Sequence, residues 1–175
     1  MSEYEDIKKG QTQAHLQKTI ETIKELGYLI DGDSVETGLS EVCWPGRFEV
    51  LKTSGPILIV DGAHNPYSME RLVETVNDHM NNSKVIVVFG ATGGHDLANM
   101  LKPLKLLEPV LIPVSSRHPK SIQSEIVSKA SLNCDIVTSK AFGSVSEGLD
   151  HAFSLAGRND LILGTGSLSV AAEVS

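Results

Sequence analysis

An acid, an imidazole and an amide stand within five positions, directly after the apolar run at residues 57–60. They are Asp61, His64 and Asn65, and Pro66 follows them. Proline suits the first turn of a helix, because its missing N–H would have no intrahelical partner there. Open α/β sheets bind ligands beyond the carboxyl ends of their strands, and helix N-termini favour anions, so this loop is a candidate catalytic and anion-binding site. The alternative is a strand-to-helix turn whose Asp61 and Asn65 only cap backbone groups.

A second loop, at residues 164–167, ends in Ser167 and lies between the apolar run 161–163 and a predicted helix over 168–174. In a parallel sheet this loop opens on the same edge as Asp61 and His64. A hydroxyl and glycine N–H groups suit a carboxylate or a phosphate. A capping serine in a tight turn has the same sequence, so both interpretations stay open.

Arg47 provides a third candidate, because it follows Pro45 and Gly46 just before a predicted strand. Its guanidinium can donate two parallel hydrogen bonds, in a bidentate arrangement, to a phosphate or a carboxylate. Pairing with Glu49 on the surface is the alternative.

Two other polar loops are weaker candidates. Residues 90–94 resemble a dinucleotide-binding glycine loop, but Asp96 stands where the fingerprint needs its third glycine, so an NAD site is disfavoured and Asp96 is expected to cap the next helix. Residues 115–120 carry two cations and an imidazole, and a solvated loop is the favoured interpretation. The six histidines show no paired helical spacing, so no zinc site is expected.

Regular alternation of apolar runs and amphipathic stretches positions these loops. Strands are predicted at residues 48–51, 57–61, 84–89, 110–114, 135–138 and 161–163, and helices at 11–26, 66–80, 97–107, 122–132, 145–156 and 168–174. Ser34 is a candidate N-cap for a further short helical piece. The turn at 54–56 makes the first strand antiparallel to the second. The pattern predicts a three-layer α/β domain with a mostly parallel sheet of about six strands and one antiparallel strand.

Composition narrows the class of protein. The chain has 175 residues, 41% of them hydrophobic and 21% charged, with a net charge of -7. Its length fits a single domain over residues 1–175, with 1–10 as a linker or tail. The acidic charge, spread without a basic stripe, argues against nucleic acid as a partner. No apolar run could span a membrane, and the N-terminus is not a signal peptide, so a cytoplasmic protein with two reduced thiols is expected, although one disulfide stays possible.

Three motifs taken together resemble the C-terminal domain of the folylpolyglutamate synthase/dihydrofolate synthase family, in the Mur ligase superfamily. They are WPGRFE at residues 44–49, VDGAHNP at 60–66 and GTGSL at 164–168. A weaker similarity lies at Gly94-His95-Asp96, where His95 stands in place of the lysine that is usual in the family. The resemblance covers about residues 10–175 and implies a Rossmann-like fold.

The resemblance also implies an activity, in which ATP activates a folate-type carboxylate as an acyl phosphate and L-glutamate attacks it. ATP and Mg²⁺ are the implied cofactors, shared with an N-terminal P-loop ATPase domain for which this chain has no motif. We therefore expect half of a bipartite site that is inactive alone. Arg47, Asp61, His64 and Asn65 are implied to bind the nucleotide, with Arg47, Asp61 and His64 catalytic; His64 and Ser167 are implied to bind glutamate. Another Mur-type amino-acid ligase and a non-catalytic anion-binding or nucleotide-binding module are the alternatives.

Overall fold

The protein is described by a computed structural model that covers residues 18–41, 44–80 and 84–175. The chain divides into two compact units, residues 1–45 and 46–175, where the sequence predicts a single domain. The first unit contains a helix over residues 18–25 and α2 (Gly32–Glu41), whereas the start of the predicted helix 11–26 and the predicted linker lie outside the described residues. Ser34 is not the N-cap of α2. The Asp31 carboxylate accepts the Ser34 N–H at 2.7 Å, and the helix starts directly after it.

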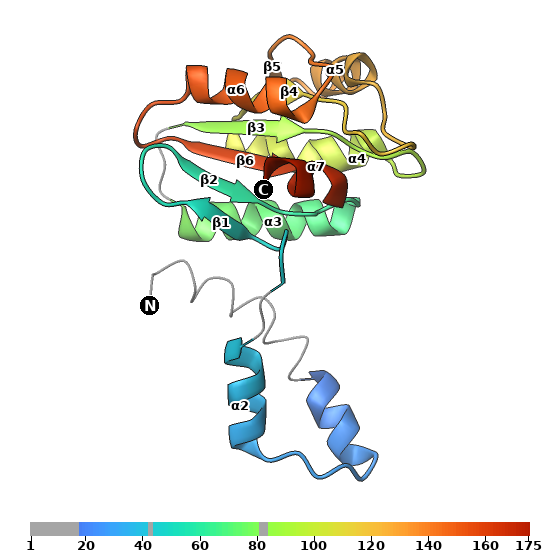
Figure 1. Cartoon of the computed structure of the whole chain (residues 1–175). Coiled ribbons are helices and arrows are strands. Elements are labelled where there is room, and N and C mark those ends of the chain that lie inside the picture. Colours follow the sequence, from blue (N-terminus) through green and yellow to red (C-terminus); the bar gives the residue numbers. More distant parts are fainter. Residues whose placement is uncertain (1–17, 42–43, 81–83) are drawn as a thin grey trace. The chain divides into compact units, whose positions relative to one another are not determined.

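A six-stranded sheet in the order β1-β2-β6-β3-β4-β5 forms the centre of the second unit (Figure 1). The edge strand β1 (Glu49–Lys52) runs antiparallel to β2 (Ile57–Val60), as the intervening turn predicts. The other strands are parallel to one another: β6 (Leu161–Thr165), β3 (Val85–Phe89), β4 (Val110–Pro113) and β5 (Val137–Thr138). The predicted mostly parallel sheet with one antiparallel strand is therefore confirmed.

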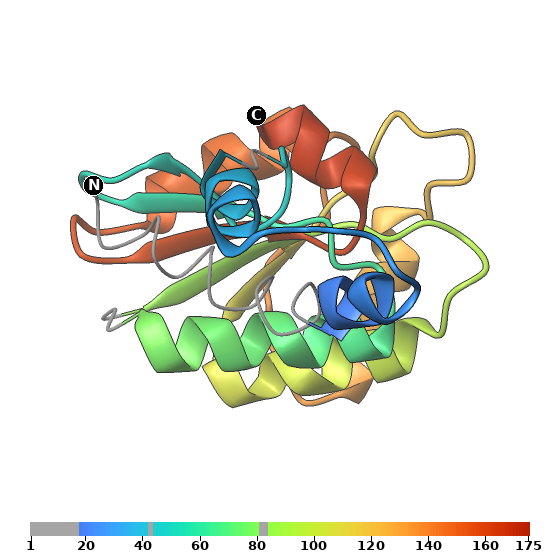
Figure 2. The ribbon, with the colours of Figure 1, turned by 90° about the horizontal axis from the view of Figure 1, so that it is seen from below.

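Helices cover both faces of this sheet. On one face lie α3 (Pro66–His79), α4 (Leu97–Leu101) and α5 (Ser124–Asn133), and on the other lie α6 (Val145–Leu155) and α7 (Leu168–Val174), as Figures 1 and 2 show. Residues on both faces of the central strands are fully buried, including Val87 and Val88 of β3. This double covering explains why these strands lack polar alternation. Within the described part of the chain, no helix has the length and apolar character to cross a bilayer.

One predicted helix differs in its second half. The segment 97–107 is α-helical only over α4 and continues as a 3₁₀ helix, η1 (Lys102–Leu107). Pro103 is the physical reason, because its ring removes one helical N–H and crowds the preceding turn. The change leaves Leu104 fully buried.

Candidate active site

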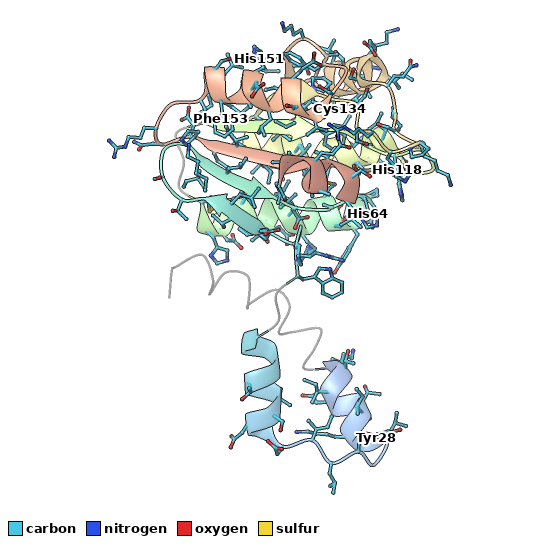
Figure 3. All side chains as sticks on the ribbon, in the orientation of Figure 1. Tyr28, His64, His118, Cys134, His151 and Phe153 are labelled. Carbon is cyan, nitrogen blue, oxygen red and sulfur yellow. The ribbon has the colours of Figure 1, made fainter. Side chains whose placement is uncertain are left out.

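The carboxyl ends of β2, β6, β3 and β4 lie side by side and are joined by backbone hydrogen bonds beyond the strands. The Asp61 N–H donates to Gly164 O at 3.0 Å, the Gly90 N–H to Thr165 O at 3.2 Å, and the Val114 N–H to Phe89 O at 2.9 Å. The loops that follow these strands therefore start from one fixed edge. Figure 3 shows His64 and His118 at this end of the sheet, whereas Phe153 lies at the opposite end.

Asp61 joins two of the predicted motifs through its carboxylate. Its Oδ2 accepts the Phe48 N–H at 2.8 Å, and its Oδ1 accepts the Ala63 N–H at 2.8 Å. A further bond runs in the opposite sense, because the Gly62 N–H of the loop donates to Gly46 O of the turn at 2.7 Å. The Arg47 turn is thus fastened directly to the loop that carries His64.

The turn around Arg47 has an unusual backbone. Gly46 and Phe48 both have left-handed conformations, with φ of 71° and 42°, and Phe48 is a bulky residue that rarely adopts one. Glu49 Oε2 accepts the Gly46 N–H at 2.7 Å, and the Phe48 side chain is buried. These contacts hold the strained turn, and they leave the Arg47 side chain exposed between its two anchored neighbours. Glu49, regarded from sequence only as a possible ion-pair partner, is an anchor of this turn.

Burial of Asp61 and its neighbouring donors and charges act in opposite directions on the pKa of its carboxyl group. Burial raises the pKa of Asp61 above its ordinary 3.8, because a desolvated carboxylate is less favourable than a neutral acid. The N–H groups of Phe48 and Ala63 oppose this shift, as do the charges of Arg47 and His64. Burial outweighs these opposing contacts, so the net effect is a raised pKa of Asp61.

His64 and Asn65 occupy the start of α3. Asn65 is its N-cap: Oδ1 accepts the Ser68 N–H at 2.9 Å, and Ser68 Oγ accepts the Asn65 N–H at 3.1 Å. His64 is half-buried, and its Nδ1 lies 2.8 Å from Gly62 O. A carbonyl oxygen only accepts, so this bond places a proton on Nδ1 and leaves Nε2 of the neutral ring as an acceptor. The Asn65 cap uses the amide oxygen alone, so the amide nitrogen keeps its donor function.

Ser167 is the N-cap of α7, and its Oγ accepts the Val170 N–H at 3.2 Å. Ser167 is only 2% exposed. Gly166 before it has φ of 99°, and a Cβ at that position would lie 2.8 Å from Gly90 O. This close approach brings the end of β6 against the end of β3. The capping interpretation of Asn65 and Ser167 is confirmed, and their ligand-binding roles remain a prediction.

The weaker candidate loops are also ordered by specific contacts. Asp96 caps α4 as predicted, with its Oδ1 3.1 Å from the Asn99 N–H that it accepts. In the loop after β4, the Arg117 N–H donates to Glu173 Oε1 at 2.7 Å, and the Lys120 N–H donates to His118 Nδ1 at 3.1 Å. The side chains of the three loop residues Arg117, His118 and Lys120 are exposed, as expected for a solvated loop.

Sequence reasoning missed one neighbour of His64. The ring of His95, from the loop between β3 and α4, lies 5.5 Å from the His64 ring, measured between centroids. Its position beside an aspartate in a glycine-rich loop gave no indication of this partner. Among the described residues, no group of three or more His, Cys, Asp or Glu side chains is placed to hold a metal ion.

Comparison with known proteins gives a consistent result. A family profile described as "Mur ligase, glutamate ligase domain" matches residues 46–168, which is nearly the whole second unit. A probable bifunctional folylpolyglutamate synthase/dihydropteroate synthase of Haloferax volcanii is 33% identical over 144 residues, covering 82% of this chain and 17% of the relative. A UDP-N-acetylmuramyl-tripeptide synthetase of Lactococcus lactis is 30% identical over 140 residues, covering 72% of this chain and 29% of that protein.

Among solved structures, E. coli FolC in complex with DHPP and ADP superposes with a TM-score of 0.79 and 25% sequence identity. The match covers 89% of this chain and 36% of that chain. The protein therefore spans roughly a third or less of the length of the relatives it matches. The predicted fold is confirmed by this similarity.

Proposed function

The chain belongs to the Mur ligase family as a glutamate ligase domain, and from this membership we propose that it is the C-terminal domain of an ATP-dependent folylpolyglutamate or dihydrofolate synthase. One observation carries the proposal: the turn of Arg47, the loop of Asp61 and His64, and the loop of Ser167 meet at one edge of the sheet. These are the three motifs on which the resemblance to the folate enzymes rests. The similarity to the Haloferax volcanii and E. coli proteins supports the same assignment.

The proposed reaction joins L-glutamate to a folate-type carboxylate. An oxygen of that carboxylate takes the terminal phosphoryl group of ATP, and ADP leaves. The glutamate amine then attacks the acyl carbon, phosphate leaves with the C–O bonding pair, and the amine loses a proton as the amide forms. Negative charge moves over the phosphoryl oxygens in the first step, so fixed donors directed at them accelerate it.

Arg47 is the proposed phosphate contact. Its exposed guanidinium is carried by a turn whose two flanking residues are anchored to Glu49 and Asp61. Such a donor needs little reorganisation when a phosphate arrives, which is the condition for strong electrostatic stabilisation. Asp61 acts mainly by holding this turn, and its ionised oxygens retain further acceptor capacity for the nucleotide or its metal shell.

The proposed glutamate and nucleotide contacts come from the adjoining loops. His64 offers its Nε2 lone pair, which can hold or accept the proton of the incoming amine. Asn65 offers its amide nitrogen as a donor to the nucleotide. Ser167 accepts the Val170 N–H with its Oγ, so its hydroxyl proton can still be donated to a carboxylate of glutamate, although a ligand must come close to reach this buried group.

Mg²⁺ fits this edge only as part of a larger set of ligands. The described residues provide Asp61, whose two oxygens already accept N–H groups, and no cluster of three ligands. Mg²⁺ commonly binds through phosphates, waters and one or two carboxylates, so it does not need a cluster of three ligands from this chain. When bound, the ion would neutralise phosphate charge. The partner that we propose is a P-loop ATPase domain, acting with this chain in the cytoplasm, without nucleic acid or membrane.

Phosphate release dependent on ATP, folate and glutamate tests the proposal. The isolated chain should show no turnover, and the complete protein should release phosphate only when all three substrates are present. Arg47→Ala in the complete protein should lower kcat by about 10²–10³, as loss of a transition-state donor does. Arg158→Ala, an exposed arginine in the turn before β6, is the matched control and should keep full activity. Robust turnover by the isolated chain, or equal activity of both variants, would overturn the assignment.

A second candidate is a Mur-type ligase that joins another amino acid to another carboxylate. The similarity to the Lactococcus lactis tripeptide synthetase supports it. Replacing the folate substrate by a UDP-N-acetylmuramyl peptide in the same assay distinguishes the two ligases. Nucleotide binding by the complete protein without phosphate release on any carboxylate would instead indicate a non-catalytic binding module.

A further inference from the structure

We propose that His64 and His95 together form a binding site for a transition-metal dication of the zinc class, separate from the magnesium of the proposed reaction. The two imidazoles come from different loops at the carboxyl edge of the sheet, after β2 and after β3. Their ring centroids lie 5.5 Å apart, with the ring planes at 67°. Among the described residues, no other two histidine rings lie in contact.

The distance agrees with coordination of one ion by both rings. A zinc–nitrogen bond is about 2.0–2.1 Å long, which places each ring centroid about 3.2 Å from the metal. At a tetrahedral angle the two centroids are then about 5.2 Å apart. The observed 5.5 Å is within a few tenths of an ångström of that value. The ring planes meet edge-on at 67°, so binding also requires a change of ring orientation that brings one nitrogen of each ring to the ion.

His64 already has the tautomer and the second hydrogen bond that are typical of a metal ligand. Its Nδ1–H donates to Gly62 O at 2.8 Å, and metal-ligating histidines usually donate their second ring nitrogen to such a carbonyl or carboxylate. The His64 backbone is fixed as well, because its N–H donates to Ser68 Oγ at 3.1 Å. His95 is exposed, so its ring can turn toward the ion.

The donor set determines which ions fit. Imidazole nitrogens suit Zn²⁺, Cu²⁺ and Ni²⁺, whereas Mg²⁺ prefers oxygen ligands. No third protein ligand is placed nearby in the described residues, so water completes the coordination and the affinity is below that of a structural zinc site. A bound ion would occupy Nε2 of His64. The expectation that this ion competes with glutamate for His64 rests on the proposed function. The expectation that the ion binds does not.

Zinc titration of the chain tests the proposal directly. Cys43 and Cys134 are first replaced by serine, because thiols also bind zinc. Calorimetry with Zn²⁺ and the imidazole ¹H–¹⁵N resonances are then followed in this parent and in three variants. We expect His64→Ala and His95→Ala each to weaken binding at least about tenfold. His79→Ala, an exposed histidine in the last turn of α3, should bind zinc as the parent does.

The resonances give an independent criterion, because Zn²⁺ should shift the rings of His64 and His95 together while Mg²⁺ leaves both in place. Equal zinc affinity of His95→Ala and the parent would overturn the proposal. So would zinc-induced shifts confined to other histidines. If His64→Ala does not fold, His95→Ala and the resonances of the parent still decide the question, since His95 is exposed and has no role in the core.

Discussion

Replacement of Asp61 tests whether its carboxylate holds the Arg47 turn to the β2–α3 loop. Asp61→Ala leaves the N–H groups of Phe48 and Ala63 without the acceptor that each has at 2.8 Å. Each lost acceptor at a buried amide costs about 1–3 kcal/mol, and partial solvation of this half-buried site favours the lower half, so about 2–4 kcal/mol is expected in total. At about 2–4 °C per kcal/mol for a chain of this size, the melting temperature should fall by about 4–16 °C. Asp61→Asn keeps one acceptor oxygen and should lose about half as much free energy.

The pH dependence of this effect has a definite sign. The pKa of Asp61 is raised above 3.8 in the folded protein by burial, so the folded state binds the proton more tightly than the unfolded chain. The part of the free energy of unfolding that is linked to this proton is therefore complete below pH 3.8 and is lost as the pH rises through the folded-state pKa, whereas the two N–H bonds to Asp61 remain. Urea unfolding of the wild type and Asp61→Asn across this range should show their difference shrinking as the pH rises.

Asp78→Asn, at an exposed aspartate of α3, provides the control and should show a difference from the wild type that is small throughout. A difference between wild type and Asp61→Asn that grows with rising pH would refute the reasoning. It would mean that the two N–H donors and the nearby cations outweigh burial, and that Asp61 stabilises the fold as a carboxylate.

Two further predictions concern the junction of β6 and α7. Gly166→Ala should lower the free energy of unfolding in urea by about 2–4 kcal/mol, because it adds a clash with Gly90 O to the strain of a left-handed backbone. The control Gly94→Ala has φ of 100° but open space around it, so it should lose only about 1–2 kcal/mol. Equal losses would contradict the packing argument. Ser167→Ala should lose about 1 kcal/mol through its cap, and Ser167→Thr should restore most of it; a melting temperature unchanged in Ser167→Ala would show that the cap is dispensable.

Local sequence patterns identified most of the elements because each is decided by near neighbours. The apolar run at β3 and the proline at the start of α3 specify a buried strand and a helix N-terminus without reference to the rest of the chain. Asp96 likewise had the right type and place for a cap. The exceptions are also local: Pro103 changes the helical geometry after α4, and Asp31 rather than Ser34 caps α2.

The candidate site was predictable as a set of loops on one edge but not as a set of contacts. Parallel strands bring the loops of Asp61 and Ser167 to the same edge, which the alternating pattern already implies. Nothing in the sequence indicates that Asp61 accepts the Phe48 N–H, because this bond joins residues of different elements and depends on a left-handed Phe48. The role of Glu49 in holding Gly46 depends on the same turn.

The sequence alone determined the layered α/β architecture, the order of the motifs and the chemistry that their side chains can offer, since periodicity and residue type are local properties of the chain. Tertiary structure alone decided that His95 lies beside His64 and that Asp61 fastens the Arg47 turn to the loop after β2. Those outcomes depend on distances between loops from separate strands, and such distances are fixed only when the sheet register and the helix packing are fixed together.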